Sequence, residues 1–430
     1  MDMVSEQRVA LALIGAGNRG RGIFGQYALD MPHRCRFTAV VEPDAAKREA
    51  FARQHGIPET ACFARSADFF AAAPAGLDGV VIATHENERL PPLQAALEAG
   101  YHILVEKPLC TNPHDLVRLT DACRDAVPIV IVCHQMRLAP RSRTLKELIA
   151  SGRYGNIVCI QHSENLSYSH MAHSFVRGFF NHSRLSPMLL AKSCHDLDIL
   201  THWMPGKPVR VASFGSLSHF KPENAPAGAP DFCLAGCPHE RDCPYHVLKM
   251  YFEDDTDPAY LRQMGVVTSK DQLRELLLTN RFGRCVYRCD NDVVDHQSVQ
   301  IEFDDGALAN FTMCGHNGVE RRMTKISMTN GELECDTAQD SLSAYSFEPL
   351  RTERYEVPAR GTHGGGDRAI MDNFVAAICS GDKSSLLTPI ADSLDGHLAV
   401  FAAEESRRTG AVIDLRAYEQ RLRAEVQAQA

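Results

Sequence analysis

The first 135 residues are dominated by five near-continuous apolar runs with helix-like segments between them. Apolar runs without alternation fit strands that are buried on both faces of a sheet. The intervening segments 43–56 and 90–100 carry a helical pattern and end in glycine, as helices commonly do. Alternating strands and helices predict an α/β fold with a doubly wound parallel sheet. The five runs are residues 8–15, 36–42, 77–84, 101–107 and 127–133.

The pattern changes after residue 135. The dipeptides at 305–306 (Asp-Gly) and 330–331 (Asn-Gly) each separate two strand-like runs, which is typical of tight hairpin turns. These hairpins predict an α+β domain with an open, mostly antiparallel sheet, and the last 65 residues return to helical patterns. We therefore expect a Rossmann domain at 1–135, a substrate-binding domain at 136–365 with a Cys- and Pro-rich loop at 221–244, and C-terminal helices at 366–430 that pack back on the core.

A G-x-G-x-x-G motif follows the first apolar run and opens the first helix, which is the context that a dinucleotide site requires. Its backbone N–H groups suit a pyrophosphate, and Glu42 ends the second strand, where a carboxylate accepts from ribose hydroxyls and favours NAD over NADP. Arg19 and Lys47 lie nearby in sequence and would soften that preference. The alternative is a glycine turn that binds nothing. The predicted cofactor contacts here are Gly15, Gly17, Asn18, Arg19, Gly20 and Glu42.

The composition narrows the function classes. The chain has 45 basic and 54 acidic residues, a net charge of −9, and no basic block, so nucleic acid and anionic membranes are poor candidates as partners. No apolar stretch is long enough for a membrane helix. The N-terminal residues do not resemble a signal peptide, and the 15 cysteines are scattered and odd in number. We therefore expect a cytoplasmic protein with mostly reduced thiols.

One predicted helix, residues 186–204, carries four polar side chains within seven residues: Lys192, His195, Asp196 and Asp198. An exposed Lys192–Asp196 ion pair at i, i+4 is the simplest interpretation of part of this cluster. The other is a catalytic site. Oxidising an alcohol with NAD needs a base for the hydroxyl proton, and histidine titrates near working pH.

The proline-rich loop at 221–244 contains Cys233, Cys237 and Cys243 in C-x3-C-x5-C spacing. Thiolates with one more ligand suit tetrahedral zinc, which would staple a loop without a core of its own. Three packed, reduced thiols are the main alternative, and a disulfide or a cluster is another. The candidate fourth ligands are Cys194, His219, His239, His246, Cys285 and Cys289.

Several motifs in this order resemble the Gfo/Idh/MocA oxidoreductase family. Besides the glycine motif they are ALEAGYHILV at 96–105, Glu106-Lys107-Pro108, KELIASGRYGNI at 146–157 and DNFVAAICSGD at 372–382. The resemblance covers nearly the whole chain and implies a Rossmann domain joined to an open-sheet domain. It also implies that Lys107 points at the substrate oxygen beside the nicotinamide, and that Thr84 and Glu106 contribute to the cofactor site.

The family's catalytic histidine lies in a D-x-x-x-H-x-x-D pattern, and His195 and Asp198 match its last two members. The first acid is replaced by Ala191, next to Lys192, and the family's Thr-Pro is changed to Thr84-His85. The resemblance makes His195 the proton-transfer residue, with Lys192 assisting Lys107. Either Asp196 or Asp198 would orient the imidazole.

A narrower resemblance is to sugar-active relatives that share the K-x-C-H-D helix, an H-M-A-H-S stretch and the three-cysteine loop. It implies that a sugar, glycoside or cyclic polyol is the substrate, often oxidised at C3, and that a polar wall binds its hydroxyls. An exposed histidine-rich loop and an ordinary Asp-Asn-Asp turn are the alternatives for parts of this wall. The predicted substrate contacts are Arg137, Tyr168, His170, His173, Arg177, Asp196, Asp292, His296 and His363.

These patterns predict an NAD-dependent oxidoreductase that moves a hydride between a ring carbon and nicotinamide. The alternative enzyme is a glycoside hydrolase in which a held NAD oxidises the sugar transiently, with elimination, water addition and no net redox change; Tyr168, His170 or Lys192 would then be the extra base. A non-catalytic NAD-binding regulator is the third reading. By resemblance, the chain forms a homodimer or homotetramer.

Overall fold

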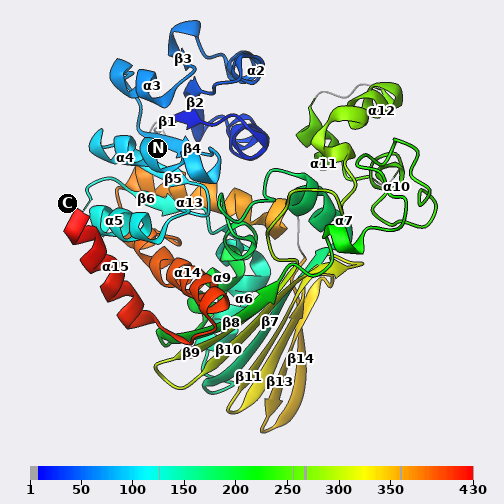
Figure 1. Cartoon of the computed structure of the whole chain (residues 1–430). Helices are drawn as coiled ribbons and strands as arrows, with labels where there is room; N and C mark the ends of the chain where they lie inside the picture. The colour runs from blue at the N-terminus through cyan, green and yellow to red at the C-terminus, as the bar shows by residue number, and fades with distance from the viewer. Residues whose placement is uncertain (1–7, 125, 255, 266–268, 359–360, 430) are drawn as a thin grey trace.

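The computed structural model describes residues 8–124, 126–254, 256–265, 269–358 and 361–429, and these form two sheets with helices around and between them (Figure 1). The first sheet has six strands in the order β3-β2-β1-β4-β5-β6, and every neighbouring pair is parallel. This confirms the predicted doubly wound sheet. Its strands are β1 (Val9–Ile14), β2 (Cys35–Val41), β3 (Cys62–Phe63), β4 (Gly79–Ile82), β5 (His102–Val105) and β6 (Val130–Val132).

The strands of the first sheet are apolar along their length, and helices on both faces of the sheet bury them. Apolar side chains of α13 pack in one core with those of β1, so this late helix completes the layer around an early strand. The helices here are α1 (Gln26–Asp30), α2 (Ala45–His55), α3 (Ser66–Ala72), α4 (Leu90–Glu98), α5 (Pro113–Arg124) and α13 (Gly366–Ser380).

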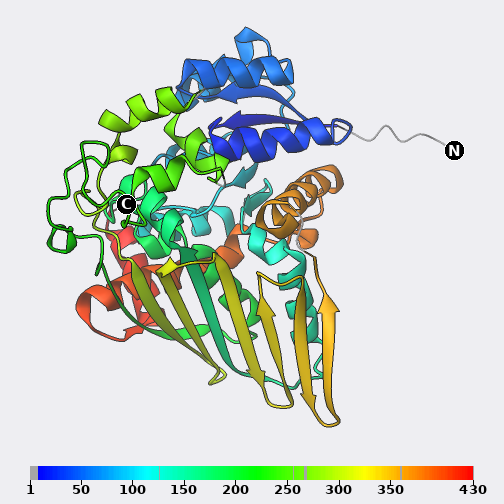
Figure 2. The same cartoon turned by 90° about the vertical axis from the view of Figure 1, so that its right-hand side faces the viewer.

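The second sheet has nine strands in the order β14-β13-β12-β11-β7-β10-β9-β8-β15, and only the β7–β10 pair is parallel, which confirms the mostly antiparallel prediction. In Figures 1 and 2 it opens away from the first domain. Its strands are β7 (Ile157–Ser167), β8 (Pro208–Ser216), β9 (His296–Phe303), β10 (Leu308–Asn317), β11 (Arg321–Met328), β12 (Gly331–Asp336), β13 (Ser341–Phe347), β14 (Leu350–Glu356) and β15 (Ile413–Asp414).

Helices lie between the two sheets, where they bury the upper face of the second sheet (Figure 1). The other face is exposed, with Phe214 on β8 and Val158 on β7 open to solvent. In the described part of the chain, no helix has the length and apolar character needed to cross a membrane. The helices of this layer are α6 (Pro140–Ala150), α8 (Met188–Ala191), α9 (Cys194–Trp203) and α14 (Ser393–Thr409), and α15 (Leu415–Gln429) follows.

The continuous helix predicted for residues 186–204 is wrong in one respect. The structure has α8 and α9 with a break at Lys192 and Ser193, where the Ser193 backbone leaves helical geometry (φ −94°, ψ 6°). The break leaves the last carbonyl of α8, that of Ala191, available to a side chain instead of an intrahelical N–H. It also changes the direction of the chain, so the periodicity of a single helix does not hold across it.

The long loop predicted at 221–244 is part of a larger segment between β8 and β9. This segment begins with the proline-rich stretch and continues through three short helices, drawn in green beside the main body (Figure 1). Its helices are α10 (Val247–Tyr251), α11 (Pro258–Met264) and α12 (Lys270–Thr279).

Candidate active site

The glycine loop between β1 and the following helix has the shape that a dinucleotide needs. Gly15 has a positive φ of 96°, and a Cβ there would lie 2.7 Å from the Ala83 backbone; a Cβ on Gly20 would overlap the Gly15 carbonyl oxygen at 1.9 Å. Above Gly17, by contrast, a Cβ would meet nothing within 4 Å. The first and third glycines therefore close the turn, while the second leaves open space where a pyrophosphate can approach the backbone. The residues fit the predicted cofactor.

Glu42 lies beside this loop at the end of β2. Its Oε2 accepts a hydrogen bond from the Ala16 N–H at 2.8 Å, and its Oε1 accepts one from the Asp44 N–H at 3.1 Å. The carboxylate is thus held at the loop, where a ribose would lie. Lys47 pairs with Asp44 at 3.5 Å.

Arg19 points away from Glu42, contrary to the idea that it would act at the ribose. Its Nε donates to Glu106 at 2.6 Å, and an Nη atom donates to Asp367 at 2.7 Å. Glu106 follows β5, and Asp367 is in the first turn of α13. The guanidinium therefore ties the glycine loop to two other elements at the carboxyl edge of the sheet.

Lys107 and His195 meet at the break between α8 and α9. The Lys107 ammonium donates to the freed Ala191 carbonyl at 2.9 Å. His195 follows three residues after the break and is 4% exposed. In the described part of the chain, neither of its ring nitrogens has a hydrogen-bond partner. Burial and the charges of Lys107 and His363 lower the pKa of His195 well below its usual value, so the imidazole is a neutral base with a free nitrogen.

His363 adds a second imidazole to this cluster from the segment before α13. Its ring centroid lies 5.7 Å from that of His195, and its Nδ1 lies 2.8 Å from Asp367 Oδ2. Burial alone would raise the pKa of Asp367, but the hydrogen bonds from His363 and Arg19 together outweigh this effect, so the pKa of this carboxyl is lowered. We name Lys107, His195, His363 and Asp367 the candidate catalytic cluster.

The two aspartates expected to orient His195 are committed elsewhere. Asp196 is fully buried; its Oδ1 lies 3.0 Å from His162 Nε2 and accepts from Arg322 Nε at 2.6 Å. Asp198 accepts two hydrogen bonds from Arg137, at 2.8 and 2.6 Å. Both pairs hold α9 on its neighbours, so in this structure Asp196 and Arg137 are engaged in structural ion pairs, and their assignment to substrate binding stays a prediction.

Lys192 contacts acids of the second sheet and does not pair with Asp196. Its Nζ lies 3.1 Å from Glu320 and 3.6 Å from Glu164, while Glu320 also lies 2.8 Å from His170 Nδ1. Burial acts against ionisation of Glu320, but His170 and Lys192 lower its pKa. The group His170, Glu320 and Lys192 is therefore a charged cluster beside the break.

Other predicted substrate residues are placed differently. His173 is buried, stacked on Tyr260 and Phe282 with centroid distances of 4.1 and 4.7 Å. Arg177 is 1% exposed and binds backbone carbonyls, so in this structure neither of these two side chains lies at an open surface. The remaining three are at the surface: Tyr168 is 37% exposed, Asp292 accepts from the Ser183 N–H, and His296 pairs with Asp295.

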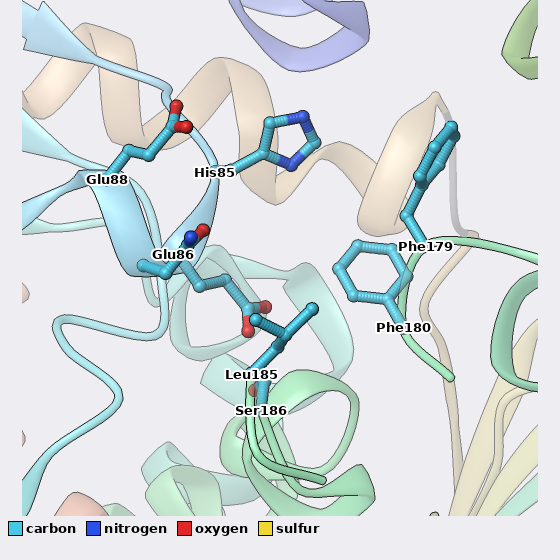
Figure 3. A pocket seen from close by; sticks show the side chains of 8 residues that line it. His85, Glu86, Glu88, Phe179, Phe180, Leu185 and Ser186 are labelled. Atoms are coloured by element: carbon cyan, nitrogen blue, oxygen red, sulfur yellow. The ribbon is translucent and has the colours of Figure 1, made fainter. Parts of the chain in front are cut away.

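A cavity of about 190 Å³ opens between the loop after β4 and residues 179–186 (Figure 3). Glu86 extends toward Leu185, with the Phe179 and Phe180 rings on the other side of the cavity. The Oε2 atom of Glu86 is buried and has no hydrogen-bond partner in the described part of the chain. Burial raises the pKa of Cys194 to about 12 and the Glu86 charge adds to it, which places this carboxylate near the start of α9. Sequence reasoning missed this cavity, although the changed Thr84-His85 pair adjoins it.

The cysteine loop does not present an assembled ion site. Cys233, Cys237 and Cys243 are free thiols, and among the described residues no three His, Cys, Asp or Glu side chains are grouped closely enough to hold a metal ion. The zinc prediction stays a prediction.

Comparison with known proteins identifies the family. A model described as an oxidoreductase family with an NAD-binding Rossmann fold matches residues 9–134, and its C-terminal alpha/beta domain matches residues 146–415. The chain belongs to the Gfo/Idh/MocA oxidoreductase family. Its first domain is the NAD-binding domain of that family, and the chain is an NAD(P)-dependent oxidoreductase.

Relatives and solved structures agree with this membership. The protein YteT of Bacillus subtilis, named as an oxidoreductase, is 23% identical over 69% of this chain and 72% of its own length. An inositol 2-dehydrogenase of Corynebacterium glutamicum is 33% identical over 29% of this chain and 36% of its own length. Levoglucosan dehydrogenase in complex with NADH and levoglucosan superposes with a TM-score of 0.71 at 18% identity, covering 95% of this chain and all of that one. UDP-N-acetylglucosamine 3-dehydrogenase of Acidithiobacillus ferrooxidans superposes with a TM-score of 0.62 at 14% identity, covering 93% of this chain and 97% of that one.

The open space above Gly17 yields a first prediction. We expect Gly17→Ala to fold normally and to bind NADH at least ten-fold more weakly, because the added methyl occupies the place of the pyrophosphate. Gly22→Ala is the matched control, since its Cβ also meets nothing within 4 Å. Calorimetric titration of NADH into the three proteins measures the difference. Equal affinities would show that the cofactor does not cross this glycine.

The buried histidines yield a second prediction, on stability. Burial lowers the pKa of His173 to about 3 and that of His202 to about 4, whereas an unfolded histidine titrates near about 6.5. Between these values the unfolded chain binds more protons, so the free energy of unfolding falls as pH decreases below about 6.5. Each such group contributes up to about 1.4 kcal/mol per pH unit.

Urea unfolding at neutral and mildly acidic pH measures this slope. The slope should be smaller in His173→Phe, which keeps the stacking on Tyr260 and Phe282 but has no titratable ring. The depressed carboxyl groups do not confuse the comparison, because their contribution is lost only below about pH 4. An unchanged slope in the variant would contradict the assignment to His173.

Proposed function

We propose that this chain is an NAD-dependent oxidoreductase that moves a hydride between a CH–OH carbon of a sugar, glycoside or cyclic polyol and the nicotinamide. The observation that carries the proposal is that Lys107 and a neutral His195 lie together at the cofactor edge of the first sheet, with no hydrogen-bond partner for the His195 ring among the described residues. The names of the relatives, which include inositol 2-dehydrogenase and levoglucosan dehydrogenase, support this class of substrate. Glu42 at the glycine loop favours NAD over NADP.

The chemistry divides between the two residues. Held at the glycine loop and Glu42, bound NAD⁺ would supply the hydride acceptor for the substrate carbon. The Lys107 ammonium exchanges its bond to the Ala191 carbonyl for one to the substrate oxygen, where it stabilises the developing alkoxide. His195 accepts the hydroxyl proton on its free ring nitrogen, because its lowered pKa keeps it neutral at working pH. In the reducing direction His195 returns the proton.

His363 and Asp367 support the base, His195, in place of the family's acid, whose position is occupied here by Ala191. Asp367 fixes the His363 ring at 2.8 Å, and that ring lies beside His195 with its side chain 35% exposed. The pair therefore offers a route for the proton between the buried His195 and solvent. Through Arg19 the same carboxylate is joined to the glycine loop, which couples the position of the base to that of the cofactor.

The cavity at Glu86 is the proposed place for the part of the substrate away from the reacting carbon. An unpaired carboxylate oxygen accepts from sugar hydroxyls, and aromatic rings such as those of Phe179 and Phe180 cover the C–H face of a sugar (Figure 3). Oxidation at C3 is the finer form of the proposal, and the 3-dehydrogenase among the structural neighbours supports it.

Hydrolysis of a glycoside through transient oxidation at NAD is the second candidate. The charged cluster of His170, Glu320 and Lys192 beside the break favours it, because elimination needs a further acid–base group. The two activities separate in one assay on an aryl glycoside. Accumulation of NADH with the aglycone retained indicates the dehydrogenase, and release of aglycone without NADH indicates the hydrolase.

The assignment of His195 is tested by His195→Asn, which keeps a polar side chain of similar size. We expect kcat to fall about 10²–10⁴-fold with NADH affinity unchanged, since a general base contributes a factor of that order. His114→Asn, at a surface pair with Glu425, is the matched control. A sugar-panel turnover screen supplies the substrate, and near wild-type kcat in the His195 variant would remove this residue from the mechanism.

The cavity is tested by Glu86→Gln. The amide keeps the shape of the side chain but removes its charge. We expect KM for the sugar to rise about ten-fold while kcat changes little, because one charge-assisted hydrogen bond is lost. Glu98→Gln at the exposed end of α4 should leave both constants unchanged. An unaltered KM in Glu86→Gln would place the substrate elsewhere.

A further inference from the structure

Four cysteines from two distant segments line one small cavity outside the candidate catalytic cluster. Its free space is about 10 Å³, roughly that of one water-sized sphere. Three of the cysteines come from the proline-rich loop and the fourth from the segment after α12, 42 residues beyond the third. All four are free thiols: Cys233, Cys237, Cys243 and Cys285.

The backbone holds two of these cysteines side by side. The Cys233 N–H donates to the Gly283 carbonyl at 3.0 Å, and the Cys285 N–H donates to the Asp231 carbonyl at 2.8 Å. Phe232 and Arg284 form the antiparallel bridge between these bonds. The two segments are therefore paired before any side chain is considered.

Two of the cysteines each begin a short turn with the same pattern, Cys-x-Tyr. In each turn the tyrosine N–H donates to the sulfur two residues before it: Tyr245 to Cys243, and Tyr287 to Cys285. Burial raises the pKa of both thiols, whereas these N–H groups favour the thiolate form. N–H donors aimed at sulfur are useful when the sulfur carries negative charge.

A buried cation faces the same cavity. Arg177 is the last residue of the π-helix Met171–Arg177. It is 1% exposed and has an Nη atom 3.6 Å from Cys233 Sγ. Its Nε and Nη2 atoms donate to the carbonyls of Arg284 and Tyr245, the Tyr251 hydroxyl is a further hydrogen-bonding neighbour, and Nη1 has no partner in the described part of the chain. Among those residues the ionisable neighbours that raise its pKa are tyrosine and cysteine side chains and no carboxylate. A guanidinium buried in this way is costly unless an anion compensates it.

We propose that Cys233, Cys237, Cys243 and Cys285 bind one thiophilic divalent cation such as Zn²⁺ as thiolates, with Arg177 as the counter-charge. Each thiol loses its proton on binding, and the four thiolates outweigh the charge of the ion, so Arg177 offsets part of the excess. The four thiols line one small space, and binding requires their side chains to rotate into it, because among the described residues no three of them are grouped closely enough to hold an ion as they stand. The site is independent of hydride transfer.

Such an ion would fasten the proline-rich loop to the segment around residue 285. Arg177 is followed directly by Gly178 and by the two phenylalanines of the substrate cavity. The ion would therefore also hold the strand of chain that carries one wall of that cavity.

Metal analysis of the full-length protein, purified without chelators or metal-affinity steps, tests the proposal. We expect about one zinc per chain in the wild type, and a content near zero in Cys243→Ser and in Cys285→Ser. Cys289→Ser is the matched control, because Cys289 lies four residues further on and outside the cavity lining, and it should keep its zinc.

Cobalt(II) reconstitution of the wild type provides a measurement that does not depend on folding of the variants. Thiolate-to-cobalt charge-transfer bands with tetrahedral d–d bands are expected, saturating at one cobalt per chain. Wild-type protein without bound metal and without these bands would overturn the proposal. Iron with labile sulfide in place of zinc would overturn the single-ion assignment, and zinc retained by both serine variants would overturn the ligand set.

Discussion

The ion pairs of Asp367 join the two halves of the candidate active site. One carboxylate oxygen holds Arg19 from the glycine loop, and the other holds His363 beside His195. The carboxylate is buried, so its charge is stabilised by these two partners and not by water. Loss of either partner would leave this buried carboxylate with only one of its two partners, so the glycine loop and the His363 ring are both held on α13. The cofactor site and the proton-transfer site are thus a single electrostatic unit.

The break between α8 and α9 is the second constraint. A continuous helix would use the Ala191 carbonyl internally, and Lys107 would lose the acceptor that holds its ammonium in place. The polar side chains at the start of α9 are buried, and there Asp196 and Asp198 need arginine partners from other elements. His195 is the member of this group without such a partner in the described part of the chain, and that isolation makes it available as a base.

Local pattern was sufficient to predict much of the fold. The apolar runs of the first domain, the glycine turn and the hairpins at 305–306 and 330–331 depend on residues close in sequence, and the structure has the corresponding strands and turns. The roles of Asp367 and Arg322 could not be read in this way. Arg19 and Asp367 are 348 residues apart, and Asp196 and Arg322 are 126 apart, so no local pattern records either pair. For Lys107 and His195 it was family resemblance, and not spacing, that indicated a shared site.

The stretch from His170 to Arg177 shows why proximity in sequence is a weak guide to a shared role. Three polar residues that were expected to form one hydroxyl-binding wall lie in three environments. His170 contacts Glu320 at the charged cluster, His173 is stacked between Tyr260 and Phe282, and Arg177 faces the cysteine cavity. A helix distributes neighbouring side chains around its axis, so each can be buried against a different part of the protein. The polar character of this stretch therefore serves three separate contacts, of which those of His173 and Arg177 are buried, and the two phenylalanines that follow line the cavity at Glu86.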